Sequence, residues 1–303
     1  MTTKITPAGS AFSLSKYLTQ RAQLIEDALE ASLPSAGPGH PKLRDAMRYC
    51  LLGAGKRFRP VLMLAACEAC GGDWKDILPV ACAVEYVHAY SLAHDDLPAM
   101  DNAMLRRGRP ACHRKYGEAM AILAGDALLT EAWRLIAAWG AQSDRTASAA
   151  KMIEELARGA GVAGMVSGQG YDIEPEGPPD VEALDKLHRM KTGALICAAV
   201  RVGAISAGAN ERLLDKLTKY ALAVGLAFQV TDDILDLAGR DTGKDTGADV
   251  SKGKRTYPIM VGMDNSRKKA RDLVREAISA LENFPGPVEP LAEIARYAIE
   301  RDK

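Results

Sequence analysis

The sequence predicts an all-α fold formed by a single domain. Of its 303 residues, 48% are hydrophobic but 5% are aromatic, so Ala, Leu, Val and Ile must build the core. This composition is typical of closely packed helices rather than of a β-sandwich. No linker rich in Pro, Gly or Ser and no internal repeat divides the chain, which favours one domain over residues 1–303.

Apolar residues at helical spacing, interrupted by Gly and Pro, mark the individual helices. The predicted helices span residues 16–33, 41–53, 58–70, 76–97, 117–139, 144–168, 181–208, 211–238, 256–283 and 288–301. Asp180 is expected to cap the helix that begins near Val181, and Gly71 to follow the C-terminus of another. Residues 1–12 lack the layout of a signal peptide, and we expect a flexible tail.

Charge and composition exclude several classes of protein. Lys and Arg balance Asp and Glu at 39 each, so the chain lacks the positive charge of a nucleic-acid-binding protein. The longest apolar run, residues 192–209, is rich in Ala and Gly and contains Arg201, which is typical of a core helix rather than a membrane span. Cys67 and Cys70 form an isolated CxxC, and we expect core residues rather than zinc ligands. Six cysteines in no disulfide pattern favour the reducing cytoplasm.

Two aspartate clusters, at residues 95–101 and 232–236, carry the functional prediction. Each ends an apolar stretch, where a carboxylate is rarely buried unless it is paired or binds a metal. In the second cluster, Asp232 lies about 40° around the helix from Asp236 and about 60° from Gln229, so these side chains share one face. The alternative is a solvated helix end, which the apolar run before the cluster disfavours.

The first cluster does not form one face of a regular helix. Asp101 follows Asp95 by six residues, a rotation of about 120° away from it, and Pro98 interrupts the hydrogen-bond ladder between them. If the residues around Pro98 bulge outward, Asp95 and Asp101 are able to bind the same ion. If the helix simply ends, they are not.

Basic residues flank both clusters, in the GKRFRP segment at residues 55–60, directly after the first cluster, and in the second half of the chain. Each alone would be ordinary surface charge. Two carboxylates ~4 Å apart repel each other by about 4 kcal/mol at an effective dielectric of roughly 20, so an anionic partner requires divalent cations here. The pattern therefore indicates a polyanion bound partly by Arg and Lys and partly through Mg²⁺, the hard ion that oxygen ligands and phosphate select.

With these motifs in this order, the chain resembles the short-chain trans-isoprenyl diphosphate synthases and is most similar to the bacterial farnesyl diphosphate synthases. The resemblance covers GKRFRP, residues 95–108, LAGDAL at 123–128, Gly168-Gln169, Lys191-Thr192-Gly193, residues 228–236 and residues 253–258. It implies the isoprenoid synthase fold, with antiparallel helices around a central cavity, and an enzyme that condenses isopentenyl diphosphate head to tail with dimethylallyl or geranyl diphosphate. It also implies a homodimer, for which the apolar segment Ala119 to Trp139 is a candidate contact.

The resemblance further implies a role for each matching residue. In such enzymes the two motifs face each other and hold three Mg²⁺ ions on the allylic diphosphate, so Asp95, Asp101 and Asp232 are expected as direct ligands. The supporting carboxylates would be Asp96, Asp233 and Asp236. The allylic diphosphate would contact Arg106, Lys191, Lys244 and Lys254, and the isopentenyl diphosphate would contact Lys56, Arg59, His88 and Arg107. Thr192 and Gln229 would stabilise the carbocation that forms when the allylic C–O bond breaks.

Tyr90 and its neighbour Ser91 are expected to set the product length. Tyr90 precedes Asp95 by five residues, about 7.5 Å down a helix axis, where a ring would close the bottom of a hydrophobic tunnel. In similar enzymes an aromatic residue here, with the two-residue insertion in the first motif, accompanies the fifteen-carbon product. We therefore expect mainly farnesyl diphosphate, with geranylgeranyl or geranyl diphosphate as alternatives and an ordinary core tyrosine as the bland interpretation.

The chain departs from the family pattern at Asn102-Ala103-Met104, where many relatives have further acidic residues, and at Arg255, where a small residue is usual. The first departure raises the prospect of weaker magnesium binding. A terpene cyclase and a non-catalytic prenyl synthase subunit are the other classes considered. Both aspartate motifs and the GKRFRP segment are intact, which argues against each of them.

Overall fold

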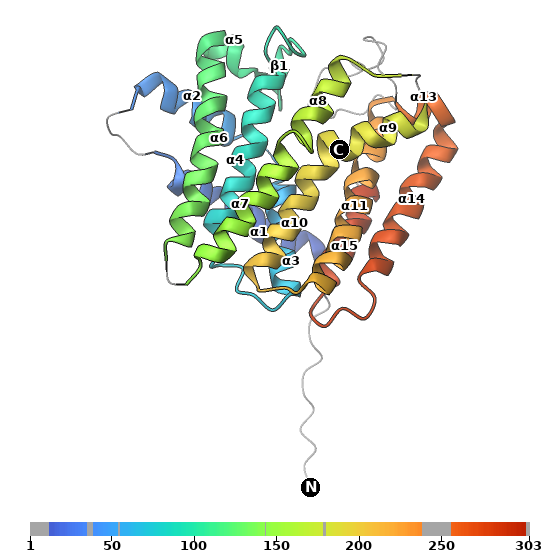
Figure 1. Ribbon diagram of the computed structural model, residues 1–303. Helices are drawn as coiled ribbons and strands as arrows, with labels where there is room; N and C mark the ends of the chain where they lie inside the picture. The colour runs from blue at the N-terminus through green and yellow to red at the C-terminus, as the bar shows by residue number, and fades with distance from the viewer. Residues whose placement is uncertain are drawn as a thin grey trace.

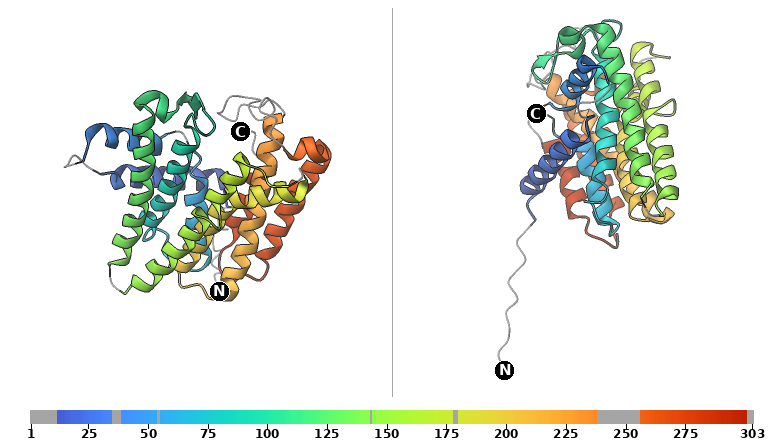
Figure 2. Two further views of the ribbon diagram at one scale, coloured as in Figure 1. Left: turned by 45° about the horizontal axis from the view of Figure 1, so that its top comes forward. Right: turned by 90° about the vertical axis from the view of Figure 1, so that its left-hand side faces the viewer.

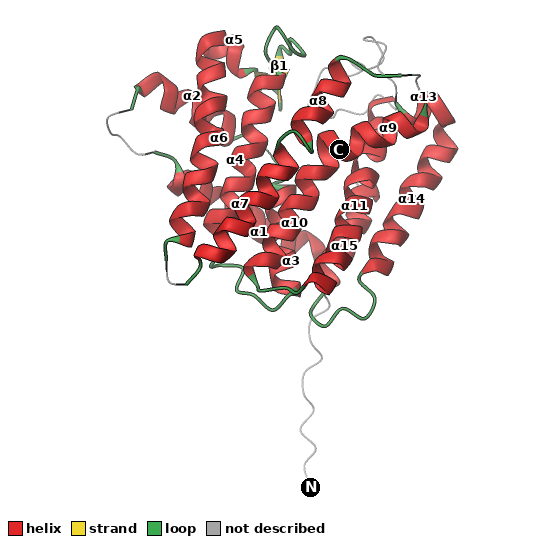
Figure 3. Cartoon of the chain, in the orientation of Figure 1, coloured by secondary structure: helices red, strands yellow, loops and turns green. Residues whose placement is uncertain are grey.

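The computed structural model describes residues 12–34, 39–53, 55–142, 144–177, 180–237 and 256–300. Helices make up nearly all of its regular structure, which confirms the predicted all-α class (Figure 3). The predicted tail, Lys244, Lys254 and Arg255 lie outside the described residues or at their border.

The helices follow one another along the chain with short connections. They are α1 (Leu14–Ser32), α2 (Pro41–Leu51), α3 (Phe58–Ala69), α4 (Leu78–Asp95), α5 (Cys112–Tyr116), α6 (Glu118–Gly140), α7 (Thr146–Ala160), α8 (Met165–Ile173), α9 (Val181–His188), the π-helical turn η1 (Arg189–Gly193), α10 (Ala194–Ser206), α11 (Glu211–Leu237), α13 (Tyr257–Val261), α14 (Met263–Ala280) and α15 (Glu289–Glu300).

Both predicted helix ends are confirmed. The Asp180 carboxylate accepts a hydrogen bond from the backbone N–H of Ala183 at 2.7 Å, which caps α9. Gly71 follows α3 with φ of 81°, and the N–H of Gly72 donates to the carbonyl of Cys67 at 2.9 Å. This is the Schellman arrangement, in which a glycine takes the left-handed conformation that other residues adopt at a penalty.

Three predicted helices are wrong in their continuity. Residues 144–168 divide into α7 and α8 at Gly161 to Gly164, and residues 256–283 divide into α13 and α14 at Gly262, whose φ is 82°. Within residues 181–208, the turn η1 widens the helix instead of breaking it. A glycine inside an apolar run thus ends a helix where the chain needs a new direction, which periodicity alone does not reveal.

A small hairpin adds an element that the sequence did not predict. β1 (Leu105–Arg106) pairs antiparallel with β2 (Arg109–Pro110). Arg107 and Gly108 form the turn with φ of 54° and 73°. Positive φ at both central residues is the signature of a type I′ turn, which matches the twist of a hairpin.

One hydrophobic core joins helices from both halves of the described chain. α3 is almost wholly buried, and α10, the predicted core helix, packs against α3, α7 and α11. The long helices run side by side (Figures 1 and 2), and α1 packs against α15 although they lie at opposite ends of the chain. Within the described ranges, no helix is long and apolar enough to cross a membrane.

The C-terminal ends of α4 and α11 lie at the same end of the bundle (Figure 1). The hairpin, α8, α9 and α13 lie at that end too. The fold therefore brings the two aspartate clusters and several of the basic segments to one end of the molecule.

Candidate active site

The loop after α4 returns the first cluster to itself. α4 ends at Asp95, yet the backbone N–H of Asp101 donates to the carbonyl of Asp95 at 2.9 Å. The intervening residues, which include Pro98, loop outward between these two positions. Asn102 then adopts φ of 49°, a left-handed conformation that Asn tolerates better than most residues. The helix does end, but the outward loop still keeps the two aspartates adjacent.

The surroundings of Asp95 include a cation from the other half of the chain. Burial raises the pKa of Asp95 above its ordinary value, and the charges of Asp101 and Asp96 raise it further. The ammonium of Lys191 and the guanidinium of Arg106 act in the opposite direction. Because Lys191 lies in η1, its field at Asp95 shows that the two halves meet at this carboxylate.

Asp96 is committed to an ion pair with Arg106. The Asp96 residue is 2% exposed, and Arg106 donates from Nε to its two oxygens at 3.0 and 3.2 Å and from Nη2 to Oδ1. Such bidentate pairs fix the guanidinium in one orientation. The structure thus places Asp96 behind Arg106, beside the expected metal ligands.

The second cluster has the shared face that its spacing predicts. The side-chain amide of Gln229 donates to Oδ2 of Asp232 at 3.2 Å, and Asp236 lies one turn further along α11. Burial lowers the pKa of Arg59 to about 10, Arg107 lowers it as well, and the charges of Glu85 and Asp232 oppose that shift. Asp232 therefore lies within the electrostatic reach of a residue from α3.

Asp233 points into a different set of contacts. Its Oδ2 accepts a hydrogen bond from the backbone N–H of Tyr257 at 3.0 Å and lies 3.3 Å from Nε2 of His188. The His188 and Tyr257 rings stack at 5.7 Å. Asp233 thereby ties α9, α11 and α13 together, a structural position that the motif alone did not reveal.

Arginines surround His88 and keep it neutral. Burial lowers the pKa of His88 well below its ordinary value, and the positive charges of Arg59, Arg107, Arg106 and Arg57 add to the effect. A neutral imidazole among guanidinium groups is a setting for an anion. Lys56, which is exposed, precedes this cluster in the same loop.

Two residues that the sequence analysis passed over hold the arginines in place. Arg57 is 2% exposed and donates to Glu85 at 2.5 Å, to Glu26 at 2.6 Å, and to the carbonyls of Leu51 and Gly53 at 3.0 Å. Glu85 is also 2% exposed and lies 4.0 Å from Arg107. An acidic residue in the middle of the apolar helix α4 was a usable signal, because a buried carboxylate needs a partner.

A π-helical turn presents Lys191 and Thr192. Such turns are rare and occur frequently at functional sites, because one extra residue per turn redirects the side chains. Lys191 donates from Nζ to Asp172 in α8 at 2.6 Å, and Thr192 is 7% exposed. Gly168 allows this close packing, since a Cβ there would lie 2.3 Å from the backbone nitrogen of Lys191. Asp172 is a further partner that the sequence analysis missed.

Tyr90 lies on the same helix, close to the first cluster. Its ring is edge-on to His94 at 5.8 Å and the residue is 8% exposed. Burial and the charge of Asp95 raise the pKa of Tyr90. Ser91 donates its hydroxyl to the carbonyl of His88 at 2.9 Å, within its own helix.

Mg²⁺ fits the donor set of these clusters. Asp95 is destabilised as an anion by burial and by Asp101, and a bound cation would relieve both effects. Among the described residues, no three Asp, Glu, His or Cys side chains come together around a single ion position. Mg²⁺ commonly takes one or two carboxylates and completes its octahedron with water and substrate phosphate.

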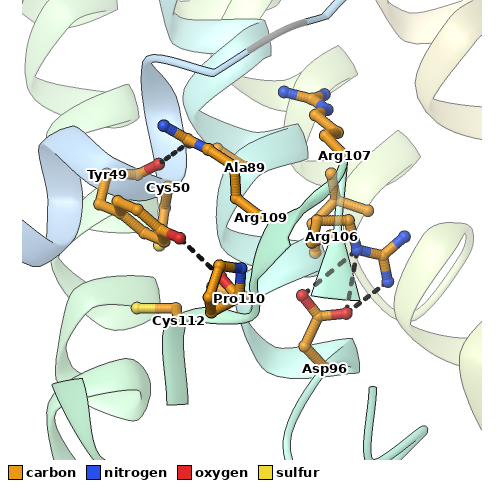
Figure 4. A pocket seen from close by; sticks show the side chains of 11 residues that line it. Tyr49, Cys50, Ala89, Asp96, Arg106, Arg107, Arg109, Pro110 and Cys112 are labelled. Carbon is orange, nitrogen blue, oxygen red and sulfur yellow. Dashed lines mark hydrogen bonds and ion pairs between the residues drawn. The ribbon is translucent and has the colours of Figure 1, made fainter. Parts of the chain in front are cut away.

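An open pocket adjoins the Asp96–Arg106 pair. It is lined by Tyr49, Cys50, Ala89, Leu92, Ala93, Asp96, Arg106, Arg107, Arg109, Pro110 and Cys112. Figure 4 shows Asp96 with Arg106 on one side of it and Tyr49, Cys50 and Cys112 on the other. The arginines of the hairpin therefore stand between this pocket and the aspartates.

The comparisons with known proteins agree with this geometry. The family model described as polyprenyl synthetase matches residues 40–294. Geranylgeranyl pyrophosphate synthase 9 of Arabidopsis thaliana is 44% identical, with 95% of this chain and 81% of the relative covered. Geranylgeranyl diphosphate synthase of Cyanophora paradoxa is 42% identical, with coverage of 98% and 99%.

Solved structures give the same answer. A putative farnesyl-diphosphate synthase from Marinomonas sp. MED121 superposes with a TM-score of 0.82 at 39% identity, covering 96% of this chain and 100% of that one. A geranyltransferase from Helicobacter pylori, complexed with magnesium and isoprenyl diphosphate, has a TM-score of 0.82 at 32% identity, with coverage of 96% and 98%.

The fold and the matched motifs are those of a prenyltransferase with the isoprenoid synthase fold. The chain belongs to the polyprenyl synthetase family.

Proposed function

We propose that the chain elongates an allylic diphosphate with isopentenyl diphosphate in a magnesium-dependent reaction. The observation that carries this proposal is the meeting of the two halves: Lys191 acts on Asp95, and Asp232 acts on Arg59. Carboxylates and cations are thus interleaved at one end of the bundle. That arrangement suits a diphosphate held partly by metal ions and partly by basic side chains.

The chain's own residues would divide the work between two diphosphates. Asp95, Asp101 and Asp232, with Asp236 in support, would hold the metal ions, while Arg106 and Lys191 contact the allylic diphosphate directly. Mg²⁺, when bound, would neutralise the charge of the departing diphosphate. The cluster around His88, with Arg59, Arg107 and Lys56, would bind isopentenyl diphosphate.

The preset partners of these groups favour preorganised electrostatic stabilisation. Asp96 orients Arg106, and Asp172 orients Lys191. Oxygen dipoles of Thr192 and Gln229 would face the allylic cation before the double bond of isopentenyl diphosphate attacks it. The released diphosphate would accept the proton that leaves at the end.

We propose geranylgeranyl diphosphate as the main product. The relatives from Arabidopsis thaliana and Cyanophora paradoxa, both above 40% identity, carry that name. Their names favour this alternative over the farnesyl diphosphate expected from the sequence.

Farnesyl diphosphate is the second candidate, and Tyr90 favours it. The ring is buried next to Asp95 in the helix that carries the first motif. An aromatic side chain here would block a tunnel that begins at the diphosphate. The titled function of the Marinomonas structure points the same way.

We also propose a homodimer formed through α6, within a single-domain chain that works in the cytoplasm. Ile122 and Leu123 on α6 are 44% and 50% exposed, which is high for large apolar side chains. Contact with a second copy would cover them.

Product analysis tests the proposed function. The purified chain would be incubated with Mg²⁺, labelled isopentenyl diphosphate and, in turn, dimethylallyl, geranyl and farnesyl diphosphate, and the dephosphorylated products separated by chromatography. We expect magnesium-dependent incorporation ending at the twenty-carbon product. Termination at fifteen carbons would favour the second candidate, and no incorporation with any primer would overturn the proposal.

A further inference from the structure

Cys50 and Cys112 form a pair of thiols at the edge of the candidate active site. Cys50 lies near the C-terminal end of α2, Cys112 begins α5, and both line the pocket next to Arg106 (Figure 4). Both are free cysteines, and a side-chain hydrogen bond links them. They come from segments sixty-two residues apart, so their meeting is a product of the fold rather than of local spacing.

The backbone around the pair is held in register. The hydroxyl of Tyr49 donates to the carbonyl of Pro110 at 2.7 Å, and Arg109 donates from Nη2 to the carbonyl of Tyr49 at 2.9 Å. These bonds join the residue before Cys50 to the residues just before Cys112. They keep the two sulfurs facing each other while the thiols are reduced.

The two thiols differ in acidity. The hydrogen bond from Cys50 lowers the pKa of Cys112, and Lys115 lowers it further, against the effect of burial. The same contact and burial raise the pKa of Cys50. Cys112 therefore ionises first, and thiolates rather than thiols react with oxidants.

We propose that Cys50 and Cys112 form a peroxide-sensitive dithiol site whose oxidation to a disulfide lowers prenyl transfer. The Cys112 thiolate attacks one oxygen of hydrogen peroxide, the O–O bond breaks, and a sulfenic acid and hydroxide form. The Cys50 sulfur then attacks Sγ of Cys112, the S–O bond breaks, and the proton from Cys50 leaves with the hydroxyl as water. Together the two thiols lose two electrons, and peroxide is reduced to two waters.

The disulfide would act on the reaction through the hairpin. Forming the bond draws Cys112 toward α2, and the hairpin that directly precedes Cys112 carries Arg106 and Arg107. Arg106 is oriented by Asp96, and Arg107 lies 4.0 Å from Glu85. Displacing groups that are fixed for catalysis by about 1 Å is enough to slow a reaction by as much as roughly a hundred-fold.

The test combines a chemical readout with an activity readout, and the second rests on the proposed function. The full chain would be reduced, treated with hydrogen peroxide, and digested under non-reducing conditions for mass spectrometry. Isopentenyl diphosphate incorporation would be measured before oxidation, after oxidation and after dithiothreitol. Cys50→Ser and Cys112→Ser remove one partner each, and Cys197→Ser is the matched control, because Cys197 is also half-buried but lies on α10.

We expect a Cys50–Cys112 linked peptide, a loss of incorporation of about ten-fold and its recovery with dithiothreitol, in the wild type and in Cys197→Ser. Cys50→Ser should keep its basal incorporation and lose the reversible response. A peptide map without this link, or a link that leaves incorporation unchanged, would overturn the proposal. Should the reduced chain incorporate no isopentenyl diphosphate, the proposed function fails, while the peptide map still decides whether the disulfide forms.

Discussion

At the scale of single residues, Asp95 and Asp96 show how neighbours with the same chemistry take different roles. Asp96 is paired with Arg106, whereas Asp95 is buried against other carboxylates and reached by Lys191. The sequence analysis placed both near the metal because their motif places both there. The ion pair that distinguishes them depends on the β1–β2 hairpin, which the sequence did not predict.

Substituting these two aspartates should change stability in opposite directions. A carboxyl whose pKa is raised by folding is protonated more readily in the folded state, so its destabilising effect is absent below the ordinary pKa and grows as pH rises through the raised value. Asp95→Asn should therefore abolish activity and raise the free energy of unfolding of the metal-free protein at pH 7, with a gain that shrinks as pH falls toward about 4.

Asp96→Asn is the matched control. It leaves Arg106 without its charge partner, which should lower the free energy of unfolding by about 2 kcal/mol. Urea denaturation across pH measures both variants. A loss of stability in Asp95→Asn at pH 7 would show that the carboxylate is stabilised in the metal-free fold.

Tyr90 gives a second prediction at this scale. Tyr90→Ala should lengthen the product distribution relative to the wild type, because a methyl group replaces a buried ring beside Asp95. Tyr90→Phe keeps the ring and should leave the distribution unchanged. Chromatography of the dephosphorylated products measures both, and an unaltered distribution in Tyr90→Ala would place the tunnel floor elsewhere.

At the scale of elements, most helices could be predicted and their interruptions could not. The cap at Asp180 and the end at Gly71 follow from residue type. The turn η1 does not, because it depends on tertiary packing of α8 and α11, where Gly168 and Gly225 let other backbones approach. Local sequence specifies where a helix is favoured, but close packing decides where one widens or breaks.

Two glycines in α8 test the importance of that packing. A Cβ at Gly168 would lie 2.3 Å from the backbone nitrogen of Lys191, whereas a Cβ at Gly170 meets nothing within 4 Å. Gly168→Ala should displace η1 and lower activity strongly. Gly170→Ala should keep full activity and raise the free energy of unfolding by up to about 1 kcal/mol, the usual difference between Gly and Ala in a helix. Equal activity of the two variants would show that η1 tolerates displacement.

At the scale of the whole molecule, the fold joins what the sequence keeps apart. Asp95 and Asp232 lie 137 positions apart, yet Lys191 acts on the first and Arg59 is acted on by the second. The motif types and their order were sufficient to predict the family and the candidate residues. The partners that hold those residues, such as Glu85 and Asp172, come from positions whose relation appears only in three dimensions.

Calorimetric binding of a non-hydrolysable allylic diphosphate analogue tests the central claim, that the two aspartate clusters hold one magnesium diphosphate together. Binding would be measured with and without Mg²⁺ for the wild type, Asp101→Asn, Asp232→Asn and the double variant. We expect each single variant to lose most of the magnesium-dependent affinity and the double variant to lose little more, because both clusters serve one complex. Magnesium-dependent affinity that is unchanged in Asp232→Asn would contradict the account.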